Sequence, residues 1–449
     1  MRPDPADAER RTIRQDLVEL LKLAGPVALS RLGIMVMGLT DAMVVGRHSA
    51  EELGFQAMGW APTAVVLTTS IGLLMGVQAM TSRAVGAGRR AETGAVLRRG
   101  VIYAFWIGLA STALLAALGP LLLHHLHLEP GLAEGAARVL LVFSLSLTPN
   151  LIASAGSAWL EGLGRPLPAT VVMWIANAAN LVFNLWLVPE HGAVGSAYAT
   201  ALARVVLVAG VLGYIANMRE ARELGVFTPA PKDLPGVREM RQVGYGAGAS
   251  FFVEVGAFSA MSVIAGWLGG LAVAGWAVVL NVASVVFMVP VGVATATAVL
   301  VGRAHGAENP HRIARAGYLG FGVALVFGML VSAVVWPAAR LIAGAYTKDA
   351  ALIELVAPAL TLACLFFAAD ALQVVAGQAL RARADILVPT IMHVASYAVV
   401  MTPLAWLLAI PLGLGLNGVV WAVIAASLAA AGMLCLRFWL RSRPAVVGA

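Results

Sequence analysis

Three acidic residues, Asp41, Glu254 and Asp370, lie well inside long apolar stretches of the sequence. Their surroundings, GLTDAMVV, FFVEVGAF and FFAADALQVV, contain no other charged residue. A charge at the centre of a bilayer costs on the order of 2.5–3.5 kcal/mol even on a lenient insertion scale, so these residues are candidates for function. Two carboxyl groups in one poorly solvated lobe resist ionising together, because burial and like charge both favour the protonated form. Such a pair would bind a proton or a monovalent cation, unless helix contacts satisfy each acid permanently.

The composition indicates the class of protein that holds these acids. Of 449 residues, 60% are apolar and 12% are charged, and the mean hydropathy is +0.87, whereas soluble domains carry roughly 25% charged residues. The alternating pattern of a membrane barrel is missing, and open sheets cannot span lipid. We therefore predict an all-α polytopic membrane protein. The polar first fifteen residues predict no secretory signal.

Charged or Pro/Gly-rich joints divide the apolar runs into about twelve predicted transmembrane helices. The longest polar joint separates two groups of six. The predicted parts are a cytoplasmic segment at 1–22, an N-lobe at 23–218 (spans 1–6), a cytoplasmic linker at 219–241, a C-lobe at 242–440 (spans 7–12) and a cytoplasmic tail at 441–449. The predicted spans are 24–47, 52–82, 97–123, 135–160, 167–188, 193–217, 242–267, 271–301, 314–343, 352–380, 386–410 and 416–439.

Basic residues are distributed unequally between the two sides of this predicted topology. Of the lysines and arginines, one side holds only Arg47, Arg138, Arg340 and Lys348, and all others outside the spans fall on the opposite side. This asymmetry predicts that both termini and the linker are cytoplasmic, in a multi-pass protein of a bacterial-type inner membrane. The net charge of +7 then reflects membrane orientation, and we expect no nucleic-acid partner.

The two halves resemble each other in sequence. The pattern GV…T…VG at 76–86 recurs 216 positions later at 292–302, and further matches at offsets near 220 follow in the same order. In this register Asp41 corresponds to Ala257, one helical turn from Glu254, and Asp370 corresponds to Asn150. Repeats of six spans enter the membrane from the same side, which predicts a pseudo-twofold axis along the membrane normal and a transport pathway between the halves.

Amides form a second group of polar residues inside the spans. Asn180 and Asn184 are four residues apart, so they share one face of span 5. They would hydrogen-bond Asp41 across the first lobe or contact substrate, and ordinary bonds between helices are the alternative. With Asn150 they are our candidates for polar positions of a cavity.

The remaining polar residues inside the predicted spans have ordinary structural explanations. Arg31 and Arg204 would be counter-charges or would extend to a membrane surface, and we expect His393 to be a packed core residue rather than a proton carrier. No Walker, HExxH or GxSxG motif occurs, and GLGLNG at 413–418 joins two helices without a preceding strand. We predict that the protein is not an enzyme and has no cofactor or metal site beyond the possible monovalent cation.

Four segments carry a family resemblance. They are LLKLAGPVALSRLGIMVMGLTDAMVVGR, WLEGLGRPLPATV, FFVEVGAFS and ADALQVVAGQALRARAD. Their residues and order resemble the multidrug and toxic compound extrusion (MATE) family, in its NorM-like branch, from about residue 15 to 440. The resemblance implies twelve helices in two pseudo-symmetric six-helix bundles. It also implies export of cationic amphipathic drugs by antiport with H+ or Na+.

The resemblance further implies roles for single residues. Positions of the family's ion-coupling and polar residues are matched by Asp41, Glu254, Asp370, Asn180 and Asn184. Pro26 matches an early proline associated with bending of helix 1 in some relatives. Phe366 stands where several NorM-like proteins have a tyrosine, and the loss of that hydroxyl favours H+ slightly over Na+ as the coupling ion.

Two other kinds of function remain as alternatives. The first is a flippase for lipids or lipid-linked saccharides from the same superfamily, although its cavity should carry cationic residues for phosphate, whereas most charges inside the spans are acidic. The second is a membrane-embedded enzyme or a passive channel. For the favoured transporter we expect a monomer whose partners are small lipophilic cations and the lipid bilayer.

Overall fold

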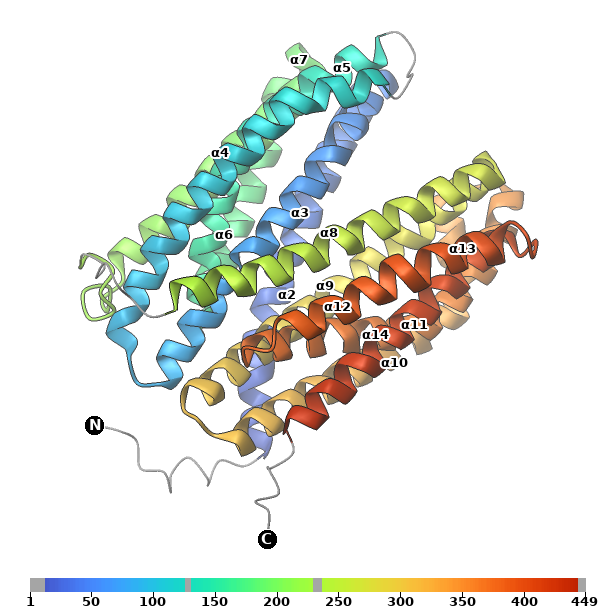
Figure 1. The fold of residues 1–449 in the computed structure, drawn as a ribbon. Helices are drawn as coiled ribbons and strands as arrows, with labels where there is room; N and C mark the ends of the chain where they lie inside the picture. Colours follow the sequence, from blue (N-terminus) through green and yellow to red (C-terminus); the bar gives the residue numbers. More distant parts are fainter. Residues whose placement is uncertain (1–12, 126–130, 229–235, 443–449) are drawn as a thin grey trace. The chain divides into compact units, whose positions relative to one another are not determined.

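The computed structural model describes residues 13–125, 131–228 and 236–442. Every regular element within these ranges is a helix (Figure 1). Eleven of the helices in this described part are long and apolar enough to cross a membrane. The prediction of an all-α polytopic membrane protein is therefore confirmed.

Eight predicted spans correspond to one helix each. These helices are α2 (Ile13–His48), α3 (Ala50–Gly86), α4 (Thr93–His125, after the 3-10 turn η1 at Arg90–Glu92), α8 (Val237–Leu268), α9 (Gly270–Gly306), α10 (Pro310–Tyr346), α11 (Ala350–Ala382) and α14 (Gly415–Ser442). They extend beyond the predicted spans, and α2 starts eleven residues early. The reason is that polar residues such as Glu19 and Lys22 favour helix, whereas hydropathy marks only the apolar part of a helix.

Predicted spans 5 and 6 form one element, α7 (Leu167–Asn217), with a break at Gly192. Gly192 has φ 56° and ψ −136°, a conformation that favours glycine. Asn180 donates to the Thr200 hydroxyl across 3.4 Å, although a straight helix would hold residues twenty positions apart about 30 Å from each other. The chain therefore reverses at Gly192, and α7 supplies two crossing segments. Counted in this way, the eleven candidate spans agree with the prediction of twelve.

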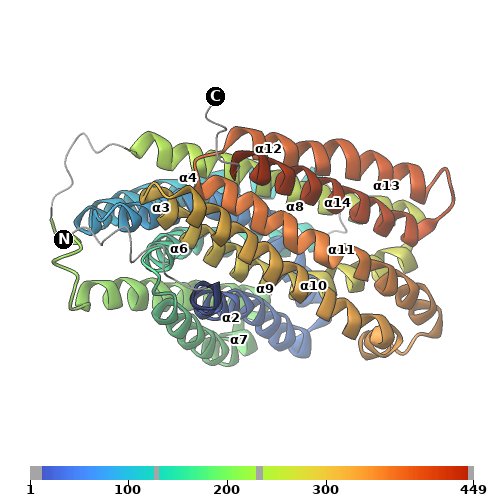
Figure 2. The same cartoon turned by 90° about the horizontal axis from the view of Figure 1, so that it is seen from below.

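Two other predicted spans are interrupted helices. Span 4 consists of α5 (Leu132–Leu145) and α6 (Leu147–Gly162). Span 11 consists of α12 (Leu387–Val394), the π-helix η2 (Ala395–Met401) and α13 (Thr402–Ala409), and Figure 2 shows α12 and α13 following one another along one line. A π-turn inside a helix is frequent at functional sites, which draws attention to this segment.

The chain divides into two compact units. The C-terminal unit takes in the chain up to Ala28 and again from Ala249 onward, and the N-terminal unit runs from Leu29 to Gly248. The boundaries therefore fall inside α2 and inside α8. The predicted lobes at 23–218 and 242–440 divide the sequence at the linker, and they remain a prediction.

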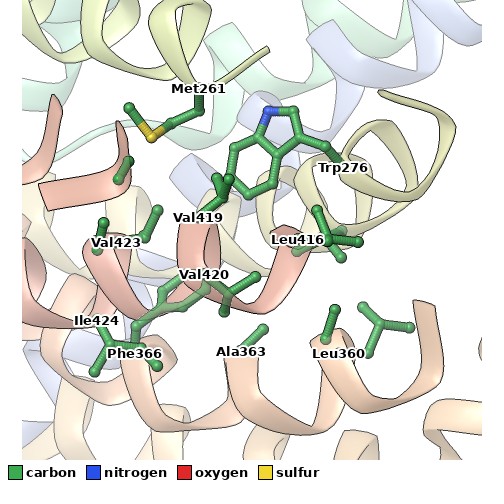
Figure 3. Close-up of a cluster of buried hydrophobic side chains, with 14 of the residues drawn as sticks. Met261, Trp276, Leu360, Ala363, Phe366, Leu416, Val419, Val420, Val423 and Ile424 are labelled. Carbon is green, nitrogen blue, oxygen red and sulfur yellow. The ribbon is translucent and has the colours of Figure 1, made fainter. Parts of the chain in front are cut away.

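Each unit is built around buried apolar helix faces. In the C-terminal unit α11 packs against α9, α10 and α14, and Figure 3 shows part of the core, with Met261, Trp276 and Phe366 among its side chains. In the N-terminal unit α3, α4 and α5 pack against one another and against α6. Small residues permit such close packing of membrane helices.

The duplication is present in the packing of the helices. A Cβ atom on Gly76 would lie 2.0 Å from the carbonyl oxygen of Met240, and one on Gly292 would lie 2.8 Å from that of Ala24. Both partners in the second contact are related to those in the first by the offset of 216 that the sequence shows. The start of α8 thus packs on α3 within the N-terminal unit as the start of α2 packs on α9 within the C-terminal unit.

Two ion pairs repeat in the same way. Arg83 pairs with Glu239 in the N-terminal unit, and Arg303 pairs with Glu19 across 3.0 Å in the C-terminal unit. The residues of these pairs correspond at an offset of 220. Each half of the sequence therefore starts with a helix whose first turns are held by the second helix of the other half.

Substituting Gly76 tests this crossing. We expect Gly76→Ala to lower the thermal midpoint of the purified protein in detergent, because overpacking a tight contact costs about 1–3 kcal/mol. Gly322→Ala is the matched control in α10, since nothing lies within 4 Å of an added Cβ there. Equal midpoints for the two variants would contradict the close approach of α3 and α8.

Candidate functional site

Asp41 lies on α2 and is almost completely buried, at 4% exposure. Its Oδ1 atom accepts hydrogen bonds from Asn180 Nδ2 at 2.9 Å and from Asn184 Nδ2 at 2.7 Å. Its Oδ2 atom accepts from the Thr200 hydroxyl at 2.5 Å. We call these four residues the Asp41 site. The predicted contact of both amides with Asp41 is present in the structure.

The local fold of α7 brings the three donors to one carboxylate. Asn180 and Asn184 lie one turn apart on the same face, before the reversal at Gly192. Thr200 lies after the reversal, so a single hairpin of two helices offers donors from both of its arms. An ionised carboxylate only accepts hydrogen bonds, and a buried charge requires such partners. The three donors therefore suit the ionised form of Asp41.

Arg204 supplies a positive charge to the same region. It is 5% exposed, interacts electrostatically with Asp41 and donates to the Ser146 hydroxyl at 2.5 Å. Its guanidinium also lies 5.7 Å from the centre of the Trp60 ring, a favourable cation–π distance. Of the two interpretations of Arg204 from the sequence, the counter-charge agrees with this burial.

Arg31 has a different partner. It pairs with Glu161 across 3.1 Å, so it is a counter-charge for an acid that the sequence places only at the end of span 4. Glu161 is 5% exposed, because α6 continues past the last predicted residue of that span and keeps Glu161 among packed helices. Loss of Arg31 would leave the buried Glu161 as an uncompensated charge, which makes this contact costly to break.

Two amide oxygens at the Asp41 site lack partners. Within the described residues, Oδ1 of Asn180 and Oδ1 of Asn184 are buried without a hydrogen bond. Buried acceptors of this kind are uncommon in folded proteins and call for an explanation. A proton on Asp41 would turn one of its oxygens into a donor, and these amide oxygens could then accept it.

A second polar cluster lies in the C-terminal unit and contains the other two acids. Glu254 on α8 lies with its Oε2 atom 3.3 Å from Nε2 of His393 on α12. Asp370 on α11 accepts from the Tyr397 hydroxyl at 3.4 Å, and the rings of His393 and Tyr397 stack with centroids 4.7 Å apart. We call these four residues the Glu254–Asp370 site. The two carboxyl groups also interact electrostatically, as expected for a pair in one lobe.

Further polar residues complete this cluster. Gln373 Nε2 donates to Oδ1 of Asp370 at 3.3 Å. Arg381 interacts electrostatically with Glu254 and donates to the Ser250 hydroxyl at 2.7 Å. The cluster therefore contains two carboxyl groups, one permanent cation and one imidazole that can become a cation.

Phe366 belongs to the apolar core of the same unit. It is 3% exposed, and its ring lies 5.1 Å from that of Phe367 in an edge arrangement. Figure 3 shows Phe366 among buried side chains of α11 and α14, next to Val420 and Ile424. The position one turn before Asp370 therefore contributes an apolar contact, and no oxygen ligand.

Two predicted residues take no part in the hydrogen bonds described for the two clusters. Asn150 is in α6, and its side chain is not among the hydrogen-bond donors of Asp41. Pro26 lies inside the continuous helix α2, two residues before the boundary between the units. Proline lacks the N–H that would bond the carbonyl of Lys22, so the predicted bend has a physical basis and remains a prediction.

Several residues of the clusters were not predicted. Thr200 and Tyr397 have no signal in hydropathy, because hydroxyl-bearing residues are common in membrane helices. A spacing argument would have found two of the cluster residues: Gln373 follows Asp370 by one turn, and Tyr397 follows His393 by one turn. In the described part of the chain, no group of three or more His, Cys, Asp or Glu residues is arranged to hold a metal ion.

Comparison with known families explains the repeated arrangement. The MatE family model matches the chain twice, at residues 26–186 and 247–407. The chain belongs to the MatE family. The two matches are 221 positions apart, which confirms the duplication. The first matched segment contains Asp41 on α2, and the second contains Glu254 on α8.

Relatives of this MatE protein cover nearly all of it. A probable multidrug resistance protein NorM from Caulobacter vibrioides is 56% identical over 96% of this chain and 92% of its own length. The multidrug resistance protein PmpM from Pseudomonas aeruginosa is 29% identical over 91% of this chain and 86% of its own length. The prediction of a NorM-like MATE transporter is confirmed.

Solved structures agree on the fold. An outward-facing multidrug resistance MATE family transporter of the MOP superfamily has a TM-score of 0.89 at 19% identity, covering 95% of this chain and 96% of its own. The eukaryotic MATE transporter AtDTX14 has a TM-score of 0.87 at 19% identity, with the same coverage. Since these identities are low, the likeness concerns the MatE fold alone.

Removing one donor tests the Asp41 site. We expect Thr200→Val to lower the thermal midpoint in detergent, because it leaves Oδ2 of a buried carboxylate without its donor, at a cost of about 1–3 kcal/mol. Thr200→Ser keeps the hydroxyl and should stay close to the wild type. If Thr200→Val and Thr200→Ser gave the same thermal midpoint, the hydrogen bond to Asp41 would make no contribution to stability.

Proposed function

We propose that this protein is a secondary active multidrug efflux transporter that exports cationic amphipathic compounds in exchange for H+ or Na+. The observation that carries the proposal is a pair of acidic clusters, one in each compact unit of a membrane protein: Asp41 is buried, and Glu254 and Asp370 are partly buried. The names of its relatives, NorM and PmpM, are those of multidrug resistance proteins, which supports drugs as the substrate class.

The Asp41 site gives the N-terminal unit two sets of contacts. Ionised Asp41 accepts three hydrogen bonds from α7. A proton on Asp41 replaces an acceptor with a donor, which weakens the bond from Thr200 and favours contact with Asn180 Oδ1 or Asn184 Oδ1. Since both arms of the α7 hairpin contribute, the protonation state of one carboxylate favours different positions of these arms. A ligand that binds one of two states better shifts the population toward it.

The Glu254–Asp370 site gives the C-terminal unit a similar dependence on cations. With both acids ionised, like charges oppose each other in a poorly solvated place. Entry of one proton or one monovalent cation relieves this repulsion. A site that responds to cations in each unit supports alternating access, in which the ion and the drug favour opposite states of the transporter.

The charges inside the helices favour a cationic substrate. Three arginines within the helices are engaged by protein groups: Arg31 by Glu161, Arg204 by Ser146 and Arg381 by Ser250. These engaged cations offer little to a phosphate headgroup, which a lipid flippase would have to bind. We further propose an inner-membrane location with both termini in the cytoplasm, since the basic residues cluster on that side of the topology.

Transport by the purified protein tests this proposal. In proteoliposomes with DNA trapped inside, ethidium entering through inside-out transporters would be read as a rise in fluorescence. We expect uptake to accelerate when the lumen is acidic or rich in Na+, and to lose at least 90% of that acceleration in Asp370→Asn and in Asp41→Asn. These variants remove the ionisable group and keep the shape of the side chain.

Glu223→Gln is the matched control, because this acid is exposed after the end of α7. Its transport should equal that of the wild type. If neither gradient accelerated ethidium uptake by well-folded wild-type protein, coupled export of cationic drugs would be wrong.

A further inference from the structure

His393 is the residue of the Glu254–Asp370 site that the proposed function leaves without a role. Its imidazole is 5% exposed, which agrees with the sequence-based expectation of a packed residue. However, Nε2 lies 3.3 Å from Oε2 of Glu254 and makes no aligned hydrogen bond within the described residues. The Nε2 atom is therefore a buried nitrogen next to a carboxylate. A proton added between the two groups would interact with both of them.

The charges around His393 come from each neighbouring helix. Glu254 faces it from α8, and α11 contributes Asp370 and Arg381, which interact with Glu254. Tyr397 stacks on the imidazole from η2. From α14, which packs against α12 and η2, Ser427 interacts with the Tyr397 hydroxyl. No alkali cation is needed to balance Glu254 when the imidazole is protonated, because Arg381 and His393 then supply two positive charges against two carboxylates.

Two positions in these surroundings offer Na+ no oxygen ligand. Hard cations bind through several oxygen ligands. On the His393 side Glu254 meets a ring nitrogen, and one turn before Asp370 the side chain is Phe366, which points into the apolar core (Figure 3). A protonated imidazole would also repel a second cation at close range.

We propose that His393 makes the Glu254–Asp370 site selective for protons. The proton that enters from water is shared between Nε2 of His393 and Oε2 of Glu254 and occupies the place that a monovalent metal ion would take. When the proton leaves toward the other side, the neutral imidazole and the carboxylate separate, and no other bond forms or breaks. The proposal rests on the proposed antiport function and names its coupling ion.

The local fold suits such a responsive pair. His393 is the next-to-last residue of α12, and the π-helix η2 starts two residues later. Tyr397 in η2 contacts both the imidazole and Asp370, so its ring connects Asp370 to the imidazole that lies beside Glu254. Movement of His393 on gaining a proton is therefore passed to Asp370 by direct contact.

The test compares His393→Gln with the wild type in the same proteoliposomes, with pH and Na+ gradients imposed separately. We expect the wild type to respond to the pH gradient and not to Na+. Without the imidazole, we expect the acceleration by the pH gradient to fall at least tenfold, with an altered pH profile, and a response to Na+ to appear. His311→Gln is the matched control, because His311 is exposed at the start of α10, and it should match the wild type.

A second measurement begins with the wild type alone. The thermal midpoint of the wild type should be the same in NaCl and in choline chloride, and in a folded His393→Gln protein NaCl should raise it. Wild-type transport driven by Na+, or an unchanged pH profile and ion response in folded His393→Gln, would overturn the role of His393 and leave antiport intact. A lack of response to both gradients in the wild type would instead overturn the proposed function.

Discussion

Buried charge in a poorly solvated environment must be compensated, and the polar architecture of this protein follows from that constraint. Asp41 receives three donors and lies near Arg204, while Glu161 receives Arg31. The compensation differs between the units: the N-terminal one relies on amides, a hydroxyl and a permanent cation, whereas the C-terminal one also includes an imidazole. Such fixed partners allow a carboxylate to stay buried and still respond to a proton.

The positions of the acids and amides could be predicted from the sequence, because a carboxylate within an apolar run has few structural explanations. Asp41 with Asn180 and Asn184 required only helical spacing. Thr200 could not be predicted, since its approach to Asp41 depends on the reversal at Gly192, which hydropathy treats as a joint between two spans. His393 was recognised as buried, but its neighbour depends on how α12 packs against α8, and that packing has no local signal.

The twelve predicted spans were also accessible from the sequence, but their ends and groupings were not. Apolar runs stop where charges begin, whereas α2 continues through Glu19, an acid that pairs with Arg303. Fold similarity does not complete the argument about substrate. The substrate class depends on the identity of the buried side chains.

The boundaries inside α2 and α8 have a consequence for the origin of the chain. Each half lends the first turns of its opening helix to the compact unit that holds most of the other half, at the equivalent contacts of Gly76 and Gly292. One half-length copy could not make both contacts with its own first helix. Two copies would make them only by exchanging their first helices, so the chain has the internal arrangement of a helix-swapped dimer.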